Sequence, residues 1–401
     1  MVQRLTVEVA VVGGGPAGLT AAIALAVSGV ATALVAARRE PDHRTTALMA
    51  GSVFALDTLG VWGACAAQAA PLRRLRIVDD TGRLPRAPEA CFEAAEIGLD
   101  AFGHNIENRH LLAALNRRAG DLAGLVRIVG EAREVAIAEE DATVVLDDGG
   151  EVRARLVVGA DGRRSICRTA AGIESDSTSC RQTALTFNLG HARAHHDTST
   201  EFHTPHGPFT LVPLPGERSS LVWVTDAGEA ERIAALDDSA LALEIERRAH
   251  AILGRISVEA GRGRFPLVIE TARRFAARRV ALVGEAAHLI PPIGAQGLNL
   301  GLRDAACIAE LAVEALRQGR DPGAETLMQR YDAQRRADVR PRTLAVDLLN
   351  RSLLTDFLPV QGVRGLGLYL IDRIGPLRRA VMREGVAPSL ALPRLMRGQA
   401  L

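Results

Sequence analysis

Residues 279–305 read RVALVGEAAHLIPPIGAQGLNLGLRDA and form the most informative stretch of the chain. In it, an apolar strand ends at Gly284 and Glu285, two prolines follow, and an Ala- and Leu-rich helix begins after Gly294. A strand that brings a carboxylate to a loop in front of a helix N-terminus suits a ligand that combines hydroxyl groups with a negatively charged ring system. The sequence therefore predicts a ligand site at this strand end.

The N-terminal residues carry a second glycine-rich turn, of the kind that binds dinucleotides. Residues 5–12 predict a buried parallel strand, residues 17–27 a helix with Pro16 in its first turn, and residues 31–35 a second strand. The G-x-G-x-x-G spacing permits a tight turn, a close approach to pyrophosphate and helix–strand packing. It is formed by Gly13, Gly15 and Gly18. Together with residues 279–305, this unit predicts a bound FAD.

The end of the second strand departs from the dinucleotide pattern. The acid that usually binds the adenosine ribose would fall near Ala36, where the sequence reads VAARRE from residue 35 to residue 40. Glu40 and Asp42 lie beyond that point and could replace the acid only through a different loop path. We therefore expect adenosine recognition to be weaker, or to come from backbone groups and Arg38.

The composition excludes several classes of protein. The 401 residues allow two or three cores, and the net charge of +1 gives no reason to expect nucleic acid as a partner. All 48 basic residues are arginine, which excludes a Walker lysine, a pyridoxal phosphate Schiff base and a lysine general base. The five cysteines form no C-x-x-C pair, so we expect reduced thiols. The histidines between residues 191 and 206 do not repeat along one face of a predicted helix, so we expect no metal site.

The apolar N-terminus has an alternative interpretation. Residues 9–37 contain no charged side chain, as in a signal peptide or a membrane helix. However, the run Gly13-Gly14-Gly15-Pro16 would break a spanning helix, and Glu8 stands where a signal peptide needs basic residues. We therefore predict a cytoplasmic protein.

The order of predicted elements indicates an α/β fold. We expect a Rossmann-like FAD-binding domain, split by an inserted, mainly antiparallel sheet domain and followed by C-terminal helices; the family resemblance given below implies that the FAD-binding domain is of the glutathione-reductase and p-hydroxybenzoate hydroxylase type. One helix is predicted over residues 42–59. The predicted boundaries are residues 1–75, 100–180 and 266–330 for the FAD-binding domain, 76–99 and 181–265 for the substrate-binding sheet domain, and 331–401 for the C-terminal helical region.

Three predicted strands end in glycines: at residues 13–18, at residues 159–162 and at residues 284–301. Ligands of open α/β sheets bind at the carboxyl ends of the strands. We therefore expect these three strand ends to converge on one ligand.

With these motifs, the chain resembles the flavoprotein aromatic hydroxylases that share the p-hydroxybenzoate hydroxylase fold, and within them the ubiquinone-biosynthesis hydroxylases. Residues 13–18 match the family's pyrophosphate fingerprint, residues 159–168 match the motif implicated in FAD and NAD(P)H handling, and residues 284–304 match the flavin ribityl motif. The resemblance covers nearly the whole chain. It departs from the family at Ala36, and at Glu285, where the ribityl motif usually has Asp.

The resemblance implies a set of site residues. The cofactor-binding residues are Gly13, Gly15, Pro16, Ala17, Gly18, Arg44, Arg109, Asp161, Gly284, Glu285, Gly297, Leu298 and Asn299. The flavin-facing loop, with no side-chain acid or base assigned, contains Pro292, Gly294, Gln296 and Gly297. The candidates for the substrate wall are Phe187, Phe209, Val212, Leu214 and Trp223, although each of them taken singly is more readily explained as sheet core. His203 and His206 are candidates for a substrate base.

The resemblance also implies the chemistry. NAD(P)H would reduce FAD, a flavin C4a-hydroperoxide would form with O₂, and one oxygen atom would be transferred to the ring of a prenylated phenol. Two alternatives stay open: a dehydrogenase or prenyl reductase of the same fold, which would not consume O₂, and a flavin-binding accessory subunit without catalysis. A halogenase is excluded, because it needs an essential lysine and a tryptophan-rich motif that this sequence lacks.

A prenylated phenol dissolves in membranes, so we expect the enzyme to meet it at the inner face of the cytoplasmic membrane or through other quinone-biosynthesis proteins. Residues 357–382 mix apolar residues with Arg364, Arg373, Arg378 and Arg379, which is typical of an interfacial helix. The alternative is a C-terminal subdomain that closes the core or docks a partner.

Overall fold

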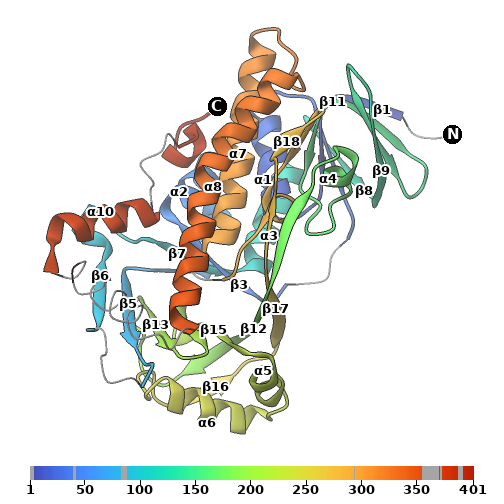
Figure 1. Ribbon diagram of the computed structural model, residues 1–401. Coiled ribbons are helices and arrows are strands. Elements are labelled where there is room, and N and C mark those ends of the chain that lie inside the picture. Colours follow the sequence, from blue (N-terminus) through green and yellow to red (C-terminus); the bar gives the residue numbers. More distant parts are fainter. Residues whose placement is uncertain are drawn as a thin grey trace.

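The computed structural model describes residues 4–38, 42–82, 88–292, 294–354, 370, 373–386 and 392–401. Within these residues, the strands form an eight-stranded sheet, a nine-stranded sheet and a small three-stranded sheet, joined by helices (Figure 1). The predicted α/β class, with a Rossmann-like part, a separate and mainly antiparallel sheet and C-terminal helices, is confirmed.

The eight-stranded sheet is the dinucleotide-binding layer. It contains β1 (Arg4–Val12), β2 (Thr32–Ala36), β8 (Leu125–Val129), β9 (Ala132–Ile137), β10 (Ala142–Leu146), β11 (Glu151–Gly159), β18 (Ala276–Ala277) and β19 (Val280–Leu282). The strands β19, β11, β1, β2 and β8 are neighbours in this order and run parallel. Val12 lies opposite Gly159, and Gly159 lies opposite Leu282, so three strands end at one edge of the sheet.

Helices cover this sheet. They are α1 (Pro16–Val27), α3 (Asn108–Gly120), the short α4 (Ile166–Ala170) and α7 (Gln296–Arg317). Every residue of α1 from Ala17 to Leu25 is buried, because α1 packs against β1, β2, α3 and α7. This surrounded position explains why the sequence of α1 is apolar on all sides, a pattern that also occurs in membrane helices.

The nine-stranded sheet is the inserted layer. It contains β5 (Arg74–Asp79), β6 (Ala90–Glu93), β12 (Ser175–His191), β13 (Thr198–Thr204), β14 (Gly207–Leu214), β15 (Arg218–Asp226), β16 (Ile256–Val258), β17 (Gly263–Ala272) and β20 (His288–Leu289). Helices α5 (Ala227–Ala234) and α6 (Asp238–Arg248) pack under one face, at the bottom of Figure 1. Strands β12 and β17 extend beyond the range 181–265, and the division into domains at the boundaries given above stays a prediction.

The predicted helix over residues 42–59 is wrong in its first half. Residues Thr45–Met49 form β3, which pairs with β7 (Gly103–Glu107), and β7 also pairs with β4 (Ala69–Pro71). Only Ala50–Thr58 is helical, as α2. The two adjacent β-branched residues, Thr45 and Thr46, favour a strand once a partner strand is available. Short 3₁₀ helices complete this region: η1 (Trp62–Ala64), η2 (Ala66–Gln68) and η3 (Ala94–Ile97).

The long helix α8 (Glu325–Leu354) links the two large sheets, because it contacts β18 and β19 of the first sheet and β14 of the second (Figure 1). It is followed by α10 (Gly375–Val386) and the 3₁₀ helix η5 (Arg394–Arg397), which packs against α2 and α7. The predicted interfacial segment 357–382 lies mostly outside the described residues, which include only 370 and 373–382 of it.

Candidate cofactor and active site

Two positions of the first glycine-rich turn can be occupied only by glycine. Gly13 has φ +120°, and a Cβ placed on it would lie 2.1 Å from the carbonyl oxygen of Ala160, which follows β11. A Cβ on Gly18 would lie 2.0 Å from the carbonyl oxygen of Gly13. The turn after β1 therefore packs directly against the end of β11 and the start of α1, as the fingerprint predicts.

The third strand end meets the same turn. Gly284, in the 3₁₀ helix η4 (Gly284–Ala286), has φ +61°. A Cβ on Gly301 of α7 would lie 3.1 Å from Cα of Gly284 and 3.4 Å from Cβ of Ala17. The three glycine-rich segments thus touch one another, as expected, and their convergence on one ligand stays a prediction.

Two helix N-termini at this edge have free backbone donors. The N-cap of α1 is Gly15 and the N-cap of α7 is Ala295, and neither helix has a side-chain cap or a first-turn acid among the described residues. Uncapped N–H groups and the helix dipole bind anionic groups such as a pyrophosphate or a reduced flavin ring. Pro16 fits its place because the first helical position needs no N–H donor.

The flavin-facing loop lies at the N-terminus of α7. Pro292 and Gly294 are exposed, and the Gln296 side chain donates a hydrogen bond to the carbonyl oxygen of Gly294 at 2.9 Å. Gly297 and Leu298 are half-buried in the first turn of the helix, where their N–H groups lack an intrahelical acceptor. Their contacts with a flavin stay predictions, and the uncapped helix start suits them.

Glu285 and Arg44 lie close enough for their opposite charges to interact. Glu285 is exposed in η4, and Arg44 is held by the carboxylate of Asp42, with Nη2 at 2.7 Å from Oδ2. The hydrogen bond to Asp42 raises the pKa of Arg44, and the negative charge of Glu285 contributes to the same effect. A carboxylate and a guanidinium beside the glycine turn suit a ligand that carries both hydroxyl and phosphate groups.

The adenosine end has no acid at the expected place. Ala36 is the last residue of β2, and a Cβ on Gly14 would lie 2.7 Å from the Cβ of Ala36. Asp42 is occupied by Arg44 and by the Asn108 side chain, which donates to it at 2.8 Å. Glu40 lies outside the described residues. Asp42 is therefore engaged within the protein, and Arg38 is exposed.

Three predicted cofactor ligands are engaged within the protein. All four hydrogen-bonding positions of the Asn299 side chain are used, by Met49 N, Ser52 Oγ, Ala47 O and Ala295 O. Asp161 accepts from Ser165 Oγ at 2.6 Å and from Cys167 N at 3.1 Å, and Arg109 pairs with Glu107 at 2.8 Å. Asn299 therefore fixes the start of α7 to β3 and α2. Direct contacts of these side chains with the cofactor stay predictions.

A buried charge network under the flavin loop was not singled out from the sequence. Asp304 accepts hydrogen bonds from Gly284 N at 3.0 Å, from His288 Nε2 at 2.7 Å and from Arg335 Nε at 2.6 Å. Burial raises the pKa of Asp304, but the charges of Arg335 and His288 outweigh burial and hold that pKa below its ordinary value. Arg335 also binds Asp338, which in turn binds Arg303. One carboxylate thus fixes both ends of the segment that carries Glu285.

The substrate-wall prediction is wrong for three aromatic residues. Phe187, Phe209 and Trp223 are buried in the core between the sheet and helices α5 and α6. The Arg248 guanidinium of α6 lies 4.8 Å above the Trp223 ring. Both faces of the sheet are covered, so an apolar side chain does not reveal from the sequence which face it occupies.

The other face of this sheet contacts the small three-stranded sheet of β3, β7 and β4. Val212 lies opposite Ser220 in the β14–β15 pair, and Ser220 Oγ accepts hydrogen bonds from Thr45 Oγ1 at 2.9 Å and from Asn105 Nδ2 at 3.1 Å. Val212 is half-buried, so its role in the substrate wall stays a prediction. Leu214 lies two residues further along β14, on the same face, and is completely buried, so its contact with substrate also stays a prediction.

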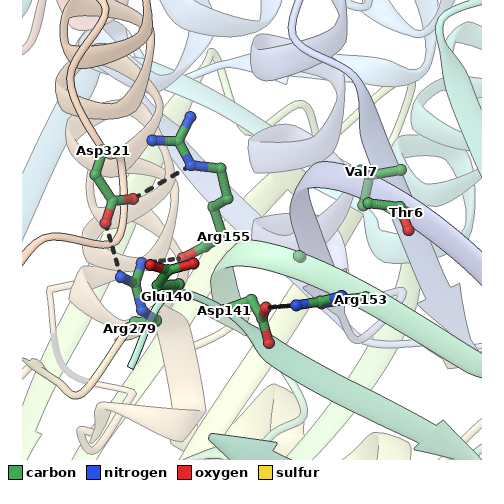
Figure 2. Close-up of a pocket in the computed structure, with 9 residues that line it drawn as sticks. Thr6, Val7, Glu140, Asp141, Arg153, Arg155, Arg279 and Asp321 are labelled. Atoms are coloured by element: carbon green, nitrogen blue, oxygen red, sulfur yellow. Dashed lines mark hydrogen bonds and ion pairs between the residues drawn. The ribbon is translucent and has the colours of Figure 1, made fainter. Parts of the chain in front are cut away.

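A polar cleft of about 430 Å³ lies at the opposite edge of the first sheet, near the amino-terminal ends of β1 and β11 (Figure 2). Asp321 binds Arg155 at 3.5 Å and Arg279 at 2.8 Å, and Arg279 donates to the carbonyl oxygen of Arg155 at 3.0 Å. These charges neutralise one another, and they tie the segment before α8 to the sheet. We assign this cleft a structural role.

Known proteins share both the sequence and the fold. Residues 6–343 match the family model described as an FAD binding domain, so the chain is an FAD-binding flavoprotein. It is 38% identical to ubiquinone hydroxylase UbiL of Rhodospirillum rubrum, over 98% of this chain and 92% of that protein. It is 32% identical to 3-demethoxyubiquinol 3-hydroxylase of Escherichia coli, over 94% and 97%. The chain therefore belongs to the FAD-dependent monooxygenase family that includes the ubiquinone hydroxylases.

The solved structures agree on the fold. The p-nitrophenol 4-monooxygenase PnpA of Pseudomonas putida superposes with a TM-score of 0.79 at 20% identity, over 96% of this chain and all of that one. FAD is the cofactor, and the steric limits at Gly13 and Gly18 and the uncapped starts of α1 and α7 fit it. NAD(P)H is the electron donor typical of the family.

Proposed function

We propose that this protein hydroxylates the aromatic ring of a prenylated phenol in ubiquinone biosynthesis. The observation that carries the proposal is the 38% identity to a ubiquinone hydroxylase over 98% of this chain. The relative in Escherichia coli, named as a 3-hydroxylase of demethoxyubiquinol, supports the same substrate class.

When bound, FAD supplies the transfer of reducing equivalents and the activation of O₂. This chain binds and orients it. The turn at Gly13 and the start of α1 would hold the pyrophosphate, and Glu285 would accept hydrogen bonds from ribityl hydroxyls. The first-turn N–H groups of α7 would stabilise negative charge on the ring system. The inserted sheet would cover the ring and exclude water from the reaction.

A deletion strain and the purified protein together test this function. We expect the strain to accumulate a quinone precursor that lacks one ring oxygen, and the FAD-loaded protein to consume O₂ and NAD(P)H faster when a prenylated phenol is present. Turnover without O₂ consumption would instead indicate a dehydrogenase. Bound FAD without any stimulated oxidation would indicate an accessory subunit.

Replacing Glu285 by alanine is expected to weaken FAD binding about tenfold or more, since a hydrogen bond to a charged group contributes about 1.5–3 kcal/mol. The fold should be unaffected, because Glu285 is exposed. FAD titration by fluorescence measures the effect. Glu285→Asp, which restores the residue usual in the family, should bind FAD like the wild type. Unchanged affinity in Glu285→Ala would rule out the carboxylate as a ligand.

We further propose that the C-terminal helix touches the membrane in which a prenylated phenol dissolves. Met382 and Arg378 face the protein, with Arg378 at 2.7 Å from Glu96, whereas Ile374, Leu377 and Val381 are exposed at helical spacing. Exposed arginines flank this stripe, as in helices that lie on anionic bilayers. No helix among the described residues is long and apolar enough to cross a membrane.

Sedimentation with anionic liposomes tests this contact. The double variant Leu377→Glu, Val381→Glu should lose most of its binding, because two charges replace the apolar face. Leu243→Glu on α6, another exposed leucine, should bind as the wild type does. Equal binding by both variants would remove this helix as the membrane contact and leave docking to another quinone-biosynthesis protein as the alternative.

A further inference from the structure

One half-buried carboxylate on the inserted sheet has an unusual partner. On β13, the Glu201 side chain accepts a hydrogen bond from His203 Nε2 at 2.8 Å and a second, longer one from Thr210 Oγ1 at 3.3 Å. Only 21% of the Glu201 side chain is exposed, and His203 is 2% exposed. The Nδ1 atom of His203 is buried and has no hydrogen-bond partner among the described residues.

The strand register places this pair on the face that contacts the small three-stranded sheet, whose strand β3 holds the start of α7 through Asn299. Glu201 lies opposite Thr210, and Thr210 lies opposite Val222. Side chains alternate along a strand, so Phe202 occupies the opposite face, in the core beneath α5 and α6. The face of Glu201 is also the face of Ser220, which bonds to Thr45 of β3.

The charge environment of Glu201 differs from that of the buried acids. Asp304 and Asp338 are paired with arginines, and so is Glu107, which binds Arg218 at 3.2 Å. In the described part of this arginine-rich chain, Glu201 forms an ion-pair contact with His203 alone. Burial raises the pKa of Glu201, and the bonds from His203 and Thr210 outweigh it, so that this pKa lies below its ordinary value.

An ionised carboxylate in such a place keeps spare acceptor capacity. Each carboxylate oxygen accepts two hydrogen bonds, and each oxygen of Glu201 receives one from the described residues. Glu201 therefore presents acceptors, and a ligand that matches it must bring a donor.

We propose that Glu201 accepts the hydrogen bond of the substrate's phenol hydroxyl and that His203 positions the Glu201 carboxylate. This inference rests on the proposed hydroxylation of a prenylated phenol. One atom of O₂, reduced with two electrons from NAD(P)H through the bound FAD, would bond to the ring carbon as the O–O bond breaks, and the other atom would leave as water. In the same step the hydroxyl proton of the phenol moves to Glu201, and the O–H electron pair becomes the C=O bond of a cyclohexadienone. The proton returns to that oxygen when the attacked carbon releases its hydrogen as a proton and the ring becomes aromatic again.

The test compares 2-prenylphenol with its methyl ether, which lacks the hydroxyl proton, as ligands of the FAD-loaded protein. The wild type should bind the phenol about tenfold or more tightly than the ether, since hydrogen bonds to charged groups are the strong ones. Glu201→Gln should lose this preference and hydroxylate about a hundredfold more slowly, the size typical of a lost general base. Glu231→Gln, an exposed acid on α5, is the matched control and should behave as the wild type does.

Variants of His203 separate positioning from folding. His203→Leu should reduce the preference for phenol, and His203→Gln, whose amide can donate to Glu201, should restore part of it. FAD content and thermal unfolding are measured on each variant, and a variant that has lost either is replaced by Glu201→Asp, which should keep a reduced preference. Wild-type preference and rate in Glu201→Gln would overturn the proposal. If no protein hydroxylates the phenol, the proposed function fails, and the binding preference still decides the role of Glu201.

Discussion

Replacing Gly13 by alanine is expected to reduce FAD affinity about a hundredfold or more, because two effects act together. The added Cβ would lie 2.1 Å from the backbone oxygen of Ala160, and φ of +120° is strained for any residue with a Cβ. The turn can relieve the contact only by moving away from β11, which opens the pyrophosphate site. Absorbance of the purified protein at the flavin band and titration of the apoprotein measure the loss.

Gly29→Ala is the matched control for this experiment. Gly29 follows the other end of α1 and has φ +83°, but a Cβ there has nothing within 4 Å. We expect it to lower stability by about 1–2 kcal/mol from backbone strain and to leave FAD binding unchanged. Equal FAD affinity in Gly13→Ala and the wild type would contradict the assignment of this turn to the pyrophosphate.

The sequence predicted the dinucleotide layer well because its constraints are local. Gly18 is required by a contact within one strand–turn–helix unit, Gly13 adopts a positive φ in the turn of that unit, and Gly284 lies two residues after its strand. Such short-range requirements leave a spacing that can be read directly. The prediction for residues 42–59 failed because β3 exists only through pairing with β7, about 60 residues away in the chain.

The substrate side was predicted less well, for a different reason. Phe209 and Val212 are three residues apart on the same strand and point to opposite faces, one into the core formed with α5 and α6 and one toward the three-stranded sheet. Since both faces are covered, polarity does not separate them. The sequence did not indicate Glu201, because Glu201 is distinguished by pairing with a histidine and with no arginine of the described residues. This pairing is visible only when the spatial neighbours of Glu201 are known.

The Asp304 network also depends on tertiary contacts. Helix α8 carries several arginines, and only the packing of α8 against α7 shows that Arg335 is the one buried on Asp304. Its neighbour Asp338 has a pKa lowered to about 2, because Arg335 and Arg303 outweigh the opposing effect of burial. Because the pKa of Asp338 is lower in the folded than in the unfolded protein, its ionised carboxylate stabilises the fold above about pH 4. This contribution is lost as the pH falls toward 2.

Asp304→Ala is expected to cost about 3–5 kcal/mol of unfolding free energy, because the buried His288 loses its carboxylate partner and the buried Arg335 keeps only Asp338. The Gly284 N–H also loses its acceptor, so the segment that carries Glu285 should loosen and FAD affinity should fall as well. Urea unfolding of the apoprotein measures the stability, and FAD titration measures the FAD affinity.

Two further variants are the controls. Asp304→Asn keeps the shape and one acceptor oxygen, and its stability and FAD affinity should lie between those of the alanine variant and the wild type. Glu314→Ala removes a surface ion pair between the same two helices, at 3.4 Å from Arg330, and should cost no more than about 1 kcal/mol. Similar losses in Asp304→Ala and Glu314→Ala would show that the network does not hold the flavin loop.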